Sequence, residues 1–254
     1  MCGGWWYFYY TICGEKIYIN EARKPSKING FRHLTNVYII KARRLSDMKK
    51  QNRFYLYCGI LMLLSELWKQ WCLTYILNHG QYNWWYFPFQ LCSIPMYLCL
   101  VIPWIHTERL RSILITFLMN FGLLGGIFAF FDTSGMHYEY LPLTIHSYAW
   151  HILLITIGLF AGLSKEADDS AKGFLGSACC YLSCCLLATF FNLTFYQYGA
   201  INMFYISPHY YMNQIVFRDI VRLWGNEAGI LSYIAATVFG GWLFHQSWKT
   251  ALKK

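Results

Sequence analysis

Six long apolar stretches decide what this chain can fold into. They run over about 54–77, 84–105, 112–131, 145–163, 174–196 and 227–245. A helix needs roughly 20 mostly apolar residues to cross a bilayer. Helices suit that environment because they satisfy all their backbone hydrogen bonds internally. The sequence therefore predicts an all-α fold: a polytopic membrane helix bundle with six transmembrane helices.

The composition excludes most other classes of protein. Charged residues make up 13% of the chain and apolar residues 57%, whereas soluble domains carry about 25% charged residues. So few charges cannot cover the surface of a soluble domain of this length. Disordered chains show the opposite bias, with low hydrophobicity and high net charge, so disorder is excluded as well.

The net positive charge is concentrated before the first apolar stretch. Residues 14–53 contain 11 Lys and Arg residues and three acids, which accounts for eight of the nine net positive charges. A basic patch beside a membrane span is suited to anionic lipid rather than to nucleic acid. We therefore expect residues 1–53 to form an N-terminal aromatic segment and a basic cytoplasmic or interfacial arm, and residues 54–248 to form the transmembrane bundle. Apolar residues at near-helical spacing in the arm predict an amphipathic helix on the inner leaflet: Phe31, Leu34, Tyr38, Leu45 and Met48.

Charges in the connecting loops alternate along the chain. Arg109 and Arg111 follow the second stretch, and Lys165 and Lys172 follow the fourth, whereas the segments 78–83 and 132–144 have neither Lys nor Arg. The positive-inside rule then places both ends of the six-span unit in the cytoplasm, with the protein in the cell membrane. The long 197–226 loop, with Arg218 and Arg222, is the exception and lies outside in this topology.

The first 19 residues contain an unbroken aromatic run over positions 5–10. Trp and Tyr prefer the headgroup zone of a membrane, which favours an interfacial segment. A short seventh span is the alternative interpretation.

Two ionisable side chains occur inside the first stretch. Glu66 and Lys69 are three residues apart, so they share one face of a helix. A charged side chain at the centre of a span costs about 2.5–3.5 kcal/mol on insertion scales. The two residues form either an internal ion pair that neutralises itself or a pair that faces a polar cavity.

Cys92 stands between Pro88 and Pro95 in the second stretch. Proline disturbs a helix, and broken helices in membranes are tolerated where they line a cavity or are buried in protein. A thiol there is a candidate nucleophile, and His146 or His151 in the fourth stretch is a candidate base. The alternatives are a small apolar cysteine and hydrogen-bonded structural histidines.

The depths of these polar groups agree. With a rise of 1.5 Å per residue, Cys92 lies roughly 12 Å and His151 roughly 9 Å below the outer face. Glu66, Lys69 and Asn120 fall near the middle of their spans, so a site in the outer half of the bundle is expected. The sequence has neither CxxC nor HxxxH spacing, so we expect no metal and no other cofactor.

Several short motifs resemble those of a known family. They are Glu66-Leu67-Trp68, Phe89-Gln90-Leu91-Cys92, Trp150-His151, and the series Asn192, Gly199, Asn202 and Tyr205. In this order and spacing they resemble the YwaF-like integral membrane family over about residues 53–245. That family is related to a eukaryotic Cys-dependent phospholipid acyltransferase. It is related more distantly to the androgen-induced and androgen-dependent lipid hydrolases, in which Thr is the nucleophile.

The resemblance implies a function and roles for the site residues. Cys92 would accept the acyl group and His151 would be its base, with Gln90, Glu66 and Asn202 lining the site. Membrane phospholipids or lysophospholipids would be the substrates. The chain departs from the family pattern in the basic 14–53 segment, which replaces an ordinary first span, and in His146, which competes with His151 as the base.

These observations predict a membrane-embedded lipid acyltransferase with an S-acyl-Cys intermediate, or the corresponding lipid ester hydrolase. Gln90 or Asn202 would donate a hydrogen bond to the oxyanion, and Lys69 and Asn120 would support the site. Two alternatives stay open. One is a transporter or channel with a polar site at mid-membrane, and the other is a non-catalytic lipid-binding or assembly subunit.

Overall fold

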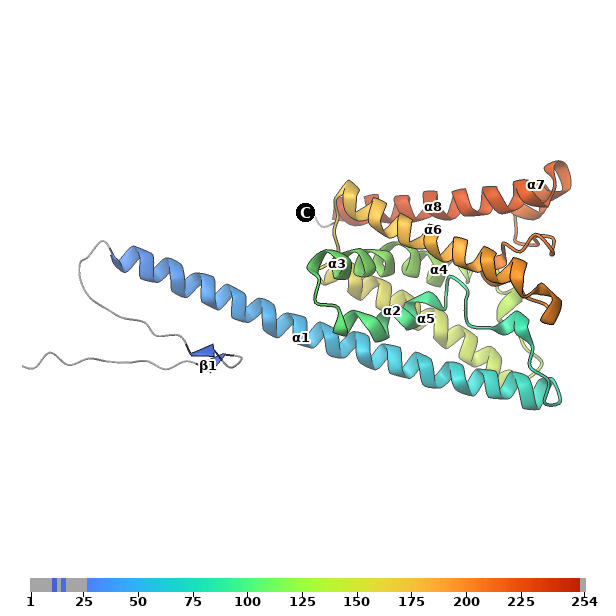
Figure 1. Cartoon of the computed structure of the whole chain (residues 1–254), viewed down its shortest axis with the longest axis horizontal. Helices are drawn as coiled ribbons and strands as arrows, with labels where there is room; N and C mark the ends of the chain where they lie inside the picture. Colours follow the sequence, from blue (N-terminus) through green and yellow to red (C-terminus); the bar gives the residue numbers. More distant parts are fainter. Residues whose placement is uncertain (1–10, 13–14, 17–26, 252–254) are drawn as a thin grey trace, which may run out of the picture. The chain divides into compact units, whose positions relative to one another are not determined.

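A computed structural model describes residues 11–12, 15–16 and 27–251, with side chains from residue 46 onward. The chain divides into two units, Met1–Lys49 and Lys50–Lys254. The second unit is a bundle of helices that run along a common direction (Figure 1). A helical bundle of this kind is the fold class that the apolar stretches predict.

Four helices of the described residues are long and apolar enough to cross a membrane. The first is a continuous rod of α3 (Glu108–Phe117), the π-helix η4 (Leu118–Gly122) and α4 (Leu123–Phe128). The others are α5 (Leu141–Leu163), α6 (Ala171–Thr194) and α8 (Asn226–Ala251). They match the four predicted stretches from 112–131 onward, and each begins one to four residues earlier than predicted.

The first predicted stretch is helical throughout but is not one of these four. Helix α1 (Lys27–Trp71) covers most of it, and the π-helix η1 (Cys72–Leu77) completes it. Glu66, Lys69 and Gln70 make this stretch more polar than the other spans.

The second stretch, over 84–105, is broken, as the prolines around Cys92 indicated. The structure has a 3-10 turn η2 (Trp84–Tyr86), a short helix α2 (Ile94–Val101) and a 3-10 turn η3 (Ile102–Trp104), with irregular backbone between η2 and α2. The reason is proline, which lacks the N–H that a helix interior requires. Pro95 is accepted in the first turn of α2, where no donor is needed, whereas Pro88 stands in the non-helical part.

The long connector after α6 is folded. It contains the 3-10 turns η6 (Tyr196–Tyr198) and η7 (Met203–Tyr205) and the helix α7 (Phe217–Trp224). Helix α7 packs on the start of α8, where the rings of Phe217 and Tyr233 meet edge to face with centroids 5.3 Å apart. The sequence predicted only a long loop over 197–226, so helix α7 was missed.

The N-terminal unit is described only in part. Strands β1 (Thr11–Ile12) and β2 (Glu15–Lys16) pair antiparallel, with Thr11 opposite Lys16. The aromatic run at 5–10 lies outside the described residues. The predicted amphipathic segment lies in the helical backbone of α1, but its side chains up to residue 45 are outside the described set.

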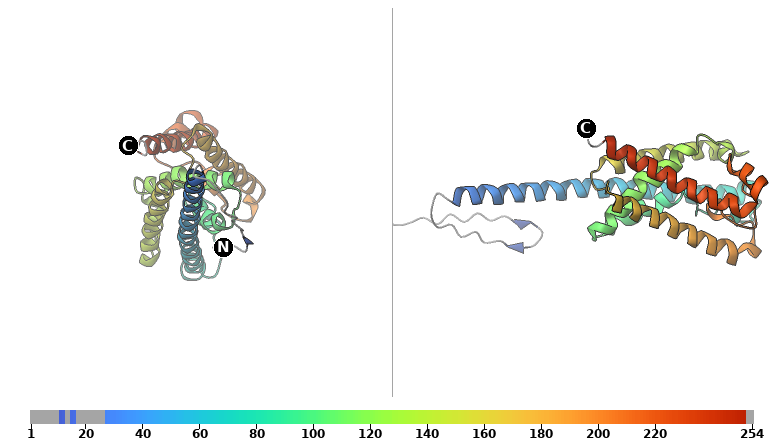
Figure 2. Two further views of the ribbon diagram at one scale, coloured as in Figure 1. Left: turned by 90° about the vertical axis from the view of Figure 1, so that its left-hand side faces the viewer. Right: turned by 90° about the horizontal axis from the view of Figure 1, so that it is seen from above.

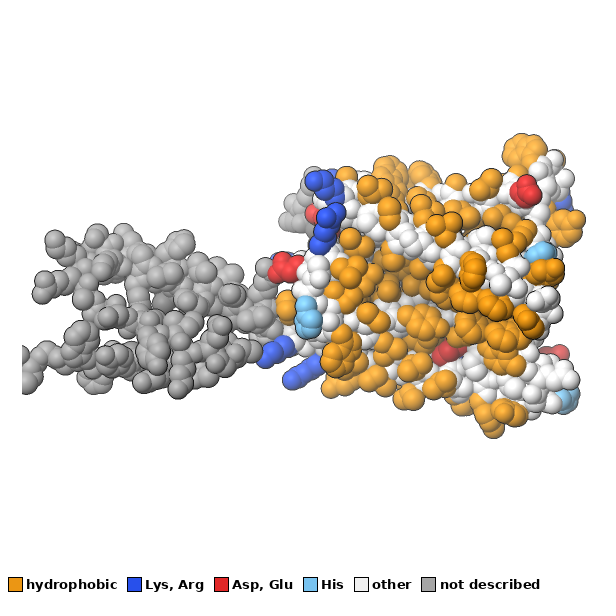
Figure 3. Space-filling view, in the orientation of Figure 1, with side chains coloured by type: hydrophobic (Ala, Val, Ile, Leu, Met, Phe, Trp, Pro, Cys, Tyr) orange, Lys and Arg blue, Asp and Glu red, His pale blue; other side chains and the backbone are white. Residues whose placement is uncertain are grey.

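The rod α3–η4–α4 is the central helix of the bundle. It packs against α5 on one side and against α6 and α8 on the other (Figure 2), and most of it is buried, whereas the other three spans are mostly open on their outer faces. Those outer faces carry Leu and aromatic side chains, which give the bundle an apolar surface in Figure 3. An apolar exterior around a packed core is the arrangement expected in lipid.

Glycine allows α4 and α5 to approach closely. A Cβ added at Gly158 would lie 2.6 Å from Leu123 Cβ and 3.0 Å from Leu123 Cα. Small residues at helix interfaces commonly allow membrane helices to pack this closely.

We expect Gly158→Ala to destabilise the protein by about 1–3 kcal/mol, because overpacking forces the two backbones apart. Thermal unfolding in detergent measures the effect. Gly135→Ala is the matched control, since nothing lies within 4 Å of a Cβ there. Equal melting temperatures for the two variants would contradict the close approach.

Lys and Arg side chains gather at one end of the bundle in Figure 3. Exposed cations at that end include Arg53 within α1, Arg109 at the start of α3, Lys165 after α5 and Lys172 at the start of α6. The segments 78–83 and 129–140, at the opposite end, have none.

The charge distribution predicts which loops face the cytoplasm. In intact cells, a membrane-impermeant maleimide should label Gly135→Cys, and it should label Asp169→Cys only after permeabilisation. The unsubstituted chain controls for its own cysteines. Labelling of Asp169→Cys in intact cells would contradict this orientation.

Candidate functional site

The broken segment between η2 and α2 brings Cys92 into the bundle. This segment leaves backbone carbonyl groups without helical partners, and side chains of other elements bind them. Gln70 Nε2 donates to Tyr86 O at 2.7 Å, and Trp150 Nε1 donates to Cys92 O at 3.1 Å. Within the segment, Tyr97 Oη donates to Pro88 O at 2.8 Å.

The far end of the broken segment is held in the same way. Arg111 Nη1 donates to Ile102 O at 2.9 Å, while the same guanidinium forms an ion pair with Glu166 at 2.7 Å. An unpaired carbonyl in an apolar environment costs several kcal/mol. These donors therefore make irregular backbone tolerable within the bundle.

Cys92 is half-buried in the bundle. It packs against a hydrophobic cluster that includes Met96, Met119 and Trp150.

The charged pair of the first stretch forms one side of the site. Lys69 Nζ lies 2.8 Å from Glu66 Oε2, and Gln70 Nε2 donates to Glu66 Oε1 at 2.7 Å. Glu66 is buried. The structure therefore shows an internal ion pair, and Gln70 links it to the Tyr86 carbonyl at the start of the broken segment.

The two histidines occupy different faces of α5. His146 lies between Trp68 and Trp150, with ring centroids 5.6 Å and 5.7 Å away, and its Nε2 is buried without a hydrogen-bond partner among the described residues. His151 is buried, and its Nδ1 lies 2.7 Å from Ser147 O. A carbonyl only accepts, so Nδ1 carries the proton and Nε2 keeps its lone pair. Both rings interact electrostatically with Lys69.

Gln90 and Asn202 join the connector after α6 to the Cys92 segment. Gln90 Nε2 donates to Asn202 O at 2.9 Å, while Asn202 Oδ1 accepts from Ser207 N at 3.0 Å. Asn202 therefore lies beside the broken segment, at the position of Gln90. Much of their hydrogen-bonding capacity holds the connector in place.

Asn120 belongs to another network. Its Nδ2 lies 3.3 Å from Ser177 Oγ and 3.2 Å from His245 Nδ1, and His245 Nε2 lies 3.2 Å from Asp169 O. This buried network joins the π-helix η4 to α6, α8 and the loop between α5 and α6. Its hydrogen bonds lead away from Cys92, toward the end of the bundle that carries the cations.

Two tyrosines of the outer loops were not predicted as site residues. Burial, followed by the negative charge of Glu66, raises the pKa of Tyr82 to about 12. Burial, followed by Tyr86, Cys92 and Glu66, raises the pKa of the Tyr138 phenol well above its usual value. Both phenols therefore stay protonated near the site. Tyrosine is common throughout this sequence, so no sequence signal singled them out.

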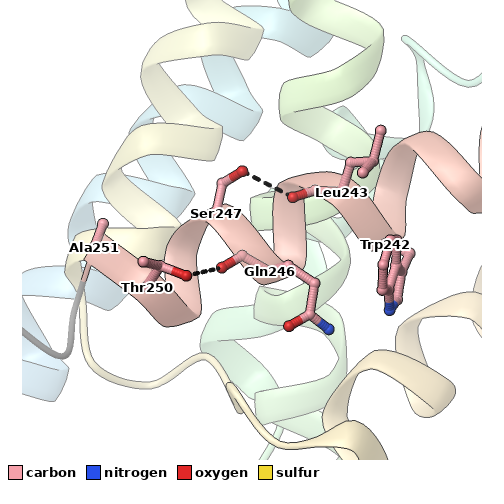
Figure 4. Close-up of a pocket in the computed structure, with 6 residues that line it drawn as sticks. All are labelled: Trp242, Leu243, Gln246, Ser247, Thr250 and Ala251. Atoms are coloured by element: carbon pink, nitrogen blue, oxygen red, sulfur yellow. Dashed lines mark hydrogen bonds between the residues drawn. The ribbon is translucent and has the colours of Figure 1, made fainter.

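A shallow groove runs along the C-terminal turns of α8, away from Cys92. It is lined by Trp242, Leu243, Gln246, Ser247, Thr250 and Ala251 (Figure 4). The hydroxyls of Ser247 and Thr250 donate to the carbonyl groups of Leu243 and Gln246, both at 2.9 Å. All six residues come from one helix, so the groove does not bring together functional side chains from different elements. Within the described residues, no group of three or more His, Cys, Asp or Glu side chains is arranged to hold a metal ion.

One family model matches most of the chain, over residues 28–242. The chain belongs to the TMEM164 family. This identifies it as a member of a membrane protein family, in agreement with its apolar helices. The matched region includes the broken segment, the Glu66–Lys69 pair and both histidines of α5. No curated protein and no solved structure matches the chain.

We expect Lys69→Met in this TMEM164-family protein to reduce stability by about 3–5 kcal/mol, because it leaves the Glu66 carboxylate buried and unpaired. The double variant Glu66→Gln/Lys69→Met should recover most of that loss, since neither charge remains. Thermal unfolding in lipid nanodiscs compares the two. Additive losses from Glu66→Gln and Lys69→Met would show that the pair is not coupled.

Proposed function

We propose that this TMEM164-family protein is a membrane-embedded lipid acyltransferase, or the corresponding lipid ester hydrolase, with Cys92 as nucleophile and His151 as base. The observation that carries the proposal is the hydrogen bond from Trp150 Nε1 to Cys92 O at 3.1 Å. It joins the histidine-bearing turn of α5 to the backbone carbonyl of the half-buried Cys92. The relation to the YwaF-like and Cys-dependent acyltransferase families is part of the same proposal.

The chemistry requires both groups. His151 Nε2 takes the proton of the Cys92 thiol, and the thiolate sulfur attacks the carbonyl carbon of a phospholipid ester. The carbon–oxygen ester bond then breaks, and the lysophospholipid leaves with the proton held by His151. In the second half, a lysolipid hydroxyl attacks the thioester carbon while His151 removes its proton. The carbon–sulfur bond breaks, and His151 returns the proton to the Cys92 sulfur. Water in place of the lysolipid gives hydrolysis.

The surroundings suit a lipid substrate. The half-buried Cys92 lies among apolar helices, so an acyl chain reaches it without crossing water. Glu66 and Lys69 form a neutral pair that supplies a local dipole rather than a net charge. We place His146, Gln90 and Asn202 in supporting positions around the substrate, and we propose no cofactor.

The proposal includes the arrangement in the membrane. The helical stretch 54–77 and the broken segment 84–104 would complete six crossings of the cell membrane together with the four apolar helices. Both ends of the six-span unit would face the cytoplasm, where the basic segment 14–53 binds anionic lipid.

Protein reconstituted in liposomes with an isotopically labelled phospholipid and an unlabelled lysophospholipid tests the function. Cys92→Ala should abolish transfer of the labelled acyl chain, because no thioester can form. His151→Ala should slow it by about 10²–10⁴-fold, the usual contribution of a general base. Mass spectrometry of the product lipids measures both rates.

Cys179→Ala is the matched control, since Cys179 is an exposed cysteine on α6 and should have no effect. His146→Ala should cost less activity than His151→Ala, and the reverse order would make His146 the base. Undiminished transfer by Cys92→Ala would refute the proposed chemistry. Labelled solute crossing the liposome membrane without lipid transfer would favour transport.

A further inference from the structure

Helix α7 and the residues before it expose apolar side chains at the end of the bundle opposite the C-terminus of α8 (Figure 1). Leu223 and Trp224, in the last turn of α7, are 74% and 73% exposed. Ile215 and Val216, just before the helix, are exposed as well. Large apolar side chains grouped on a surface mark a site that contacts a protein or a membrane.

The exposed side chains divide α7 into two sides. Successive residues of a helix are about 100° apart, so Arg218, Asp219 and Arg222 share one arc of α7. Leu223 and Trp224 fall on the remaining, apolar arc. Polar and apolar arcs of this kind are typical of a helix that lies along a membrane surface.

Packing and hydrogen bonds fix the direction in which this apolar arc faces. Phe217 meets Tyr233 of α8 edge to face, and a Cβ added at Gly229 of α8 would collide with the Val221 side chain. Asn226, the first residue of α8, binds the connector before α7. Its Nδ2 donates to Tyr210 O and its Oδ1 accepts from Met212 N, both at 3.0 Å. Helix α7 is therefore docked on α8 with a defined outer side.

Exposed aromatic side chains mark the membrane level of this end of the bundle. They belong to the connectors between η1 and α2 and between α6 and α7: Tyr82, Trp84, Tyr196, Tyr198 and Tyr211. Trp and Tyr prefer the headgroup zone of a membrane. Because α7 ends the second of these connectors, it lies near the same level.

The charges of α7 are the exception to the charge alternation in the sequence. Arg222 Nη1 lies 3.2 Å from Asp219 Oδ1, and Arg218 Nε lies 3.9 Å from the same oxygen. Two arginines share one acid, so this side of α7 keeps a net positive charge. Long arginine side chains can extend from a buried stem to a polar layer, and lipid phosphates supply the complementary charge there.

We propose that α7 is an interfacial helix whose partner is the phospholipid bilayer. Leu223 and Trp224 enter the boundary between headgroups and acyl chains, and Arg218 and Arg222 contact lipid phosphates. The apolar surface continues from α7 onto α8, where Leu231 is exposed on the lipid-facing exterior of the bundle. This continuity favours lipid over a protein partner. The inference goes beyond the proposed catalytic function and does not depend on it.

Electron paramagnetic resonance of the full-length protein in phosphatidylcholine nanodiscs tests the proposal. A nitroxide is attached to Leu223→Cys or, as the matched variant on the polar arc, to Asp219→Cys. Power saturation then compares collisions with oxygen, which concentrates in lipid, and with a nickel chelate, which stays in water. The ratio of oxygen to nickel accessibility should be several-fold higher at position 223 than at position 219. Trp224→Cys should agree with Leu223→Cys.

The unsubstituted chain, treated in the same way, gives the signal of the native cysteines, which is subtracted. Gly135→Cys, in an exposed connector, is the reference for water. A preference for the nickel chelate at positions 223 and 224 equal to that at position 135 would place α7 in water and overturn the proposal. Exclusion of both reagents from positions 223 and 224 would show that a second copy of the chain covers this side, which also overturns it.

Discussion

The backbone carbonyl groups of the broken second segment need hydrogen-bond donors, and side chains from several helices of the bundle supply them. A carbonyl without a partner costs several kcal/mol in an apolar environment. Side chains of α1, α3 and α5 provide the donors, through Gln70, Arg111 and Trp150. Because those donors come from three helices, they fix where Cys92 lies relative to each of them. The same hydrogen bonds that make the irregular backbone tolerable thus build the site.

The bundle contains two separate polar centres. One surrounds Cys92 and joins α1, the broken segment, α5 and the connector after α6. The other joins Asn120 to Ser177 and His245 and satisfies loop carbonyls near the cation-rich end. Buried polar groups are stabilising only when they are hydrogen-bonded, and the second centre is mostly satisfied. The first retains two buried polar atoms without a hydrogen-bond partner among the described residues, His146 Nε2 and Gln90 Oε1, as expected where a ligand supplies the missing partners.

The sequence predicted the parts of the fold that depend on long apolar runs. Four of its six stretches became long apolar helices, and the prolines around Cys92 indicated broken backbone. It could not predict that the 84–105 stretch would be only half helical. How much irregular backbone the segment tolerates depends on hydrogen-bond donors from helices far away in the sequence. It grouped Asn120 with Cys92 from depth alone, but depth does not determine which face of a helix a residue occupies.

The central claim is that the broken segment presents the Cys92 sulfur to a histidine of α5. Electron cryo-microscopy of the protein in a lipid nanodisc would measure the distance from Cys92 Sγ to His151 Nε2. The account predicts about 3–4 Å, slightly longer without bound lipid. A sulfur enclosed by hydrocarbon side chains, more than about 8 Å from that nitrogen, would contradict it.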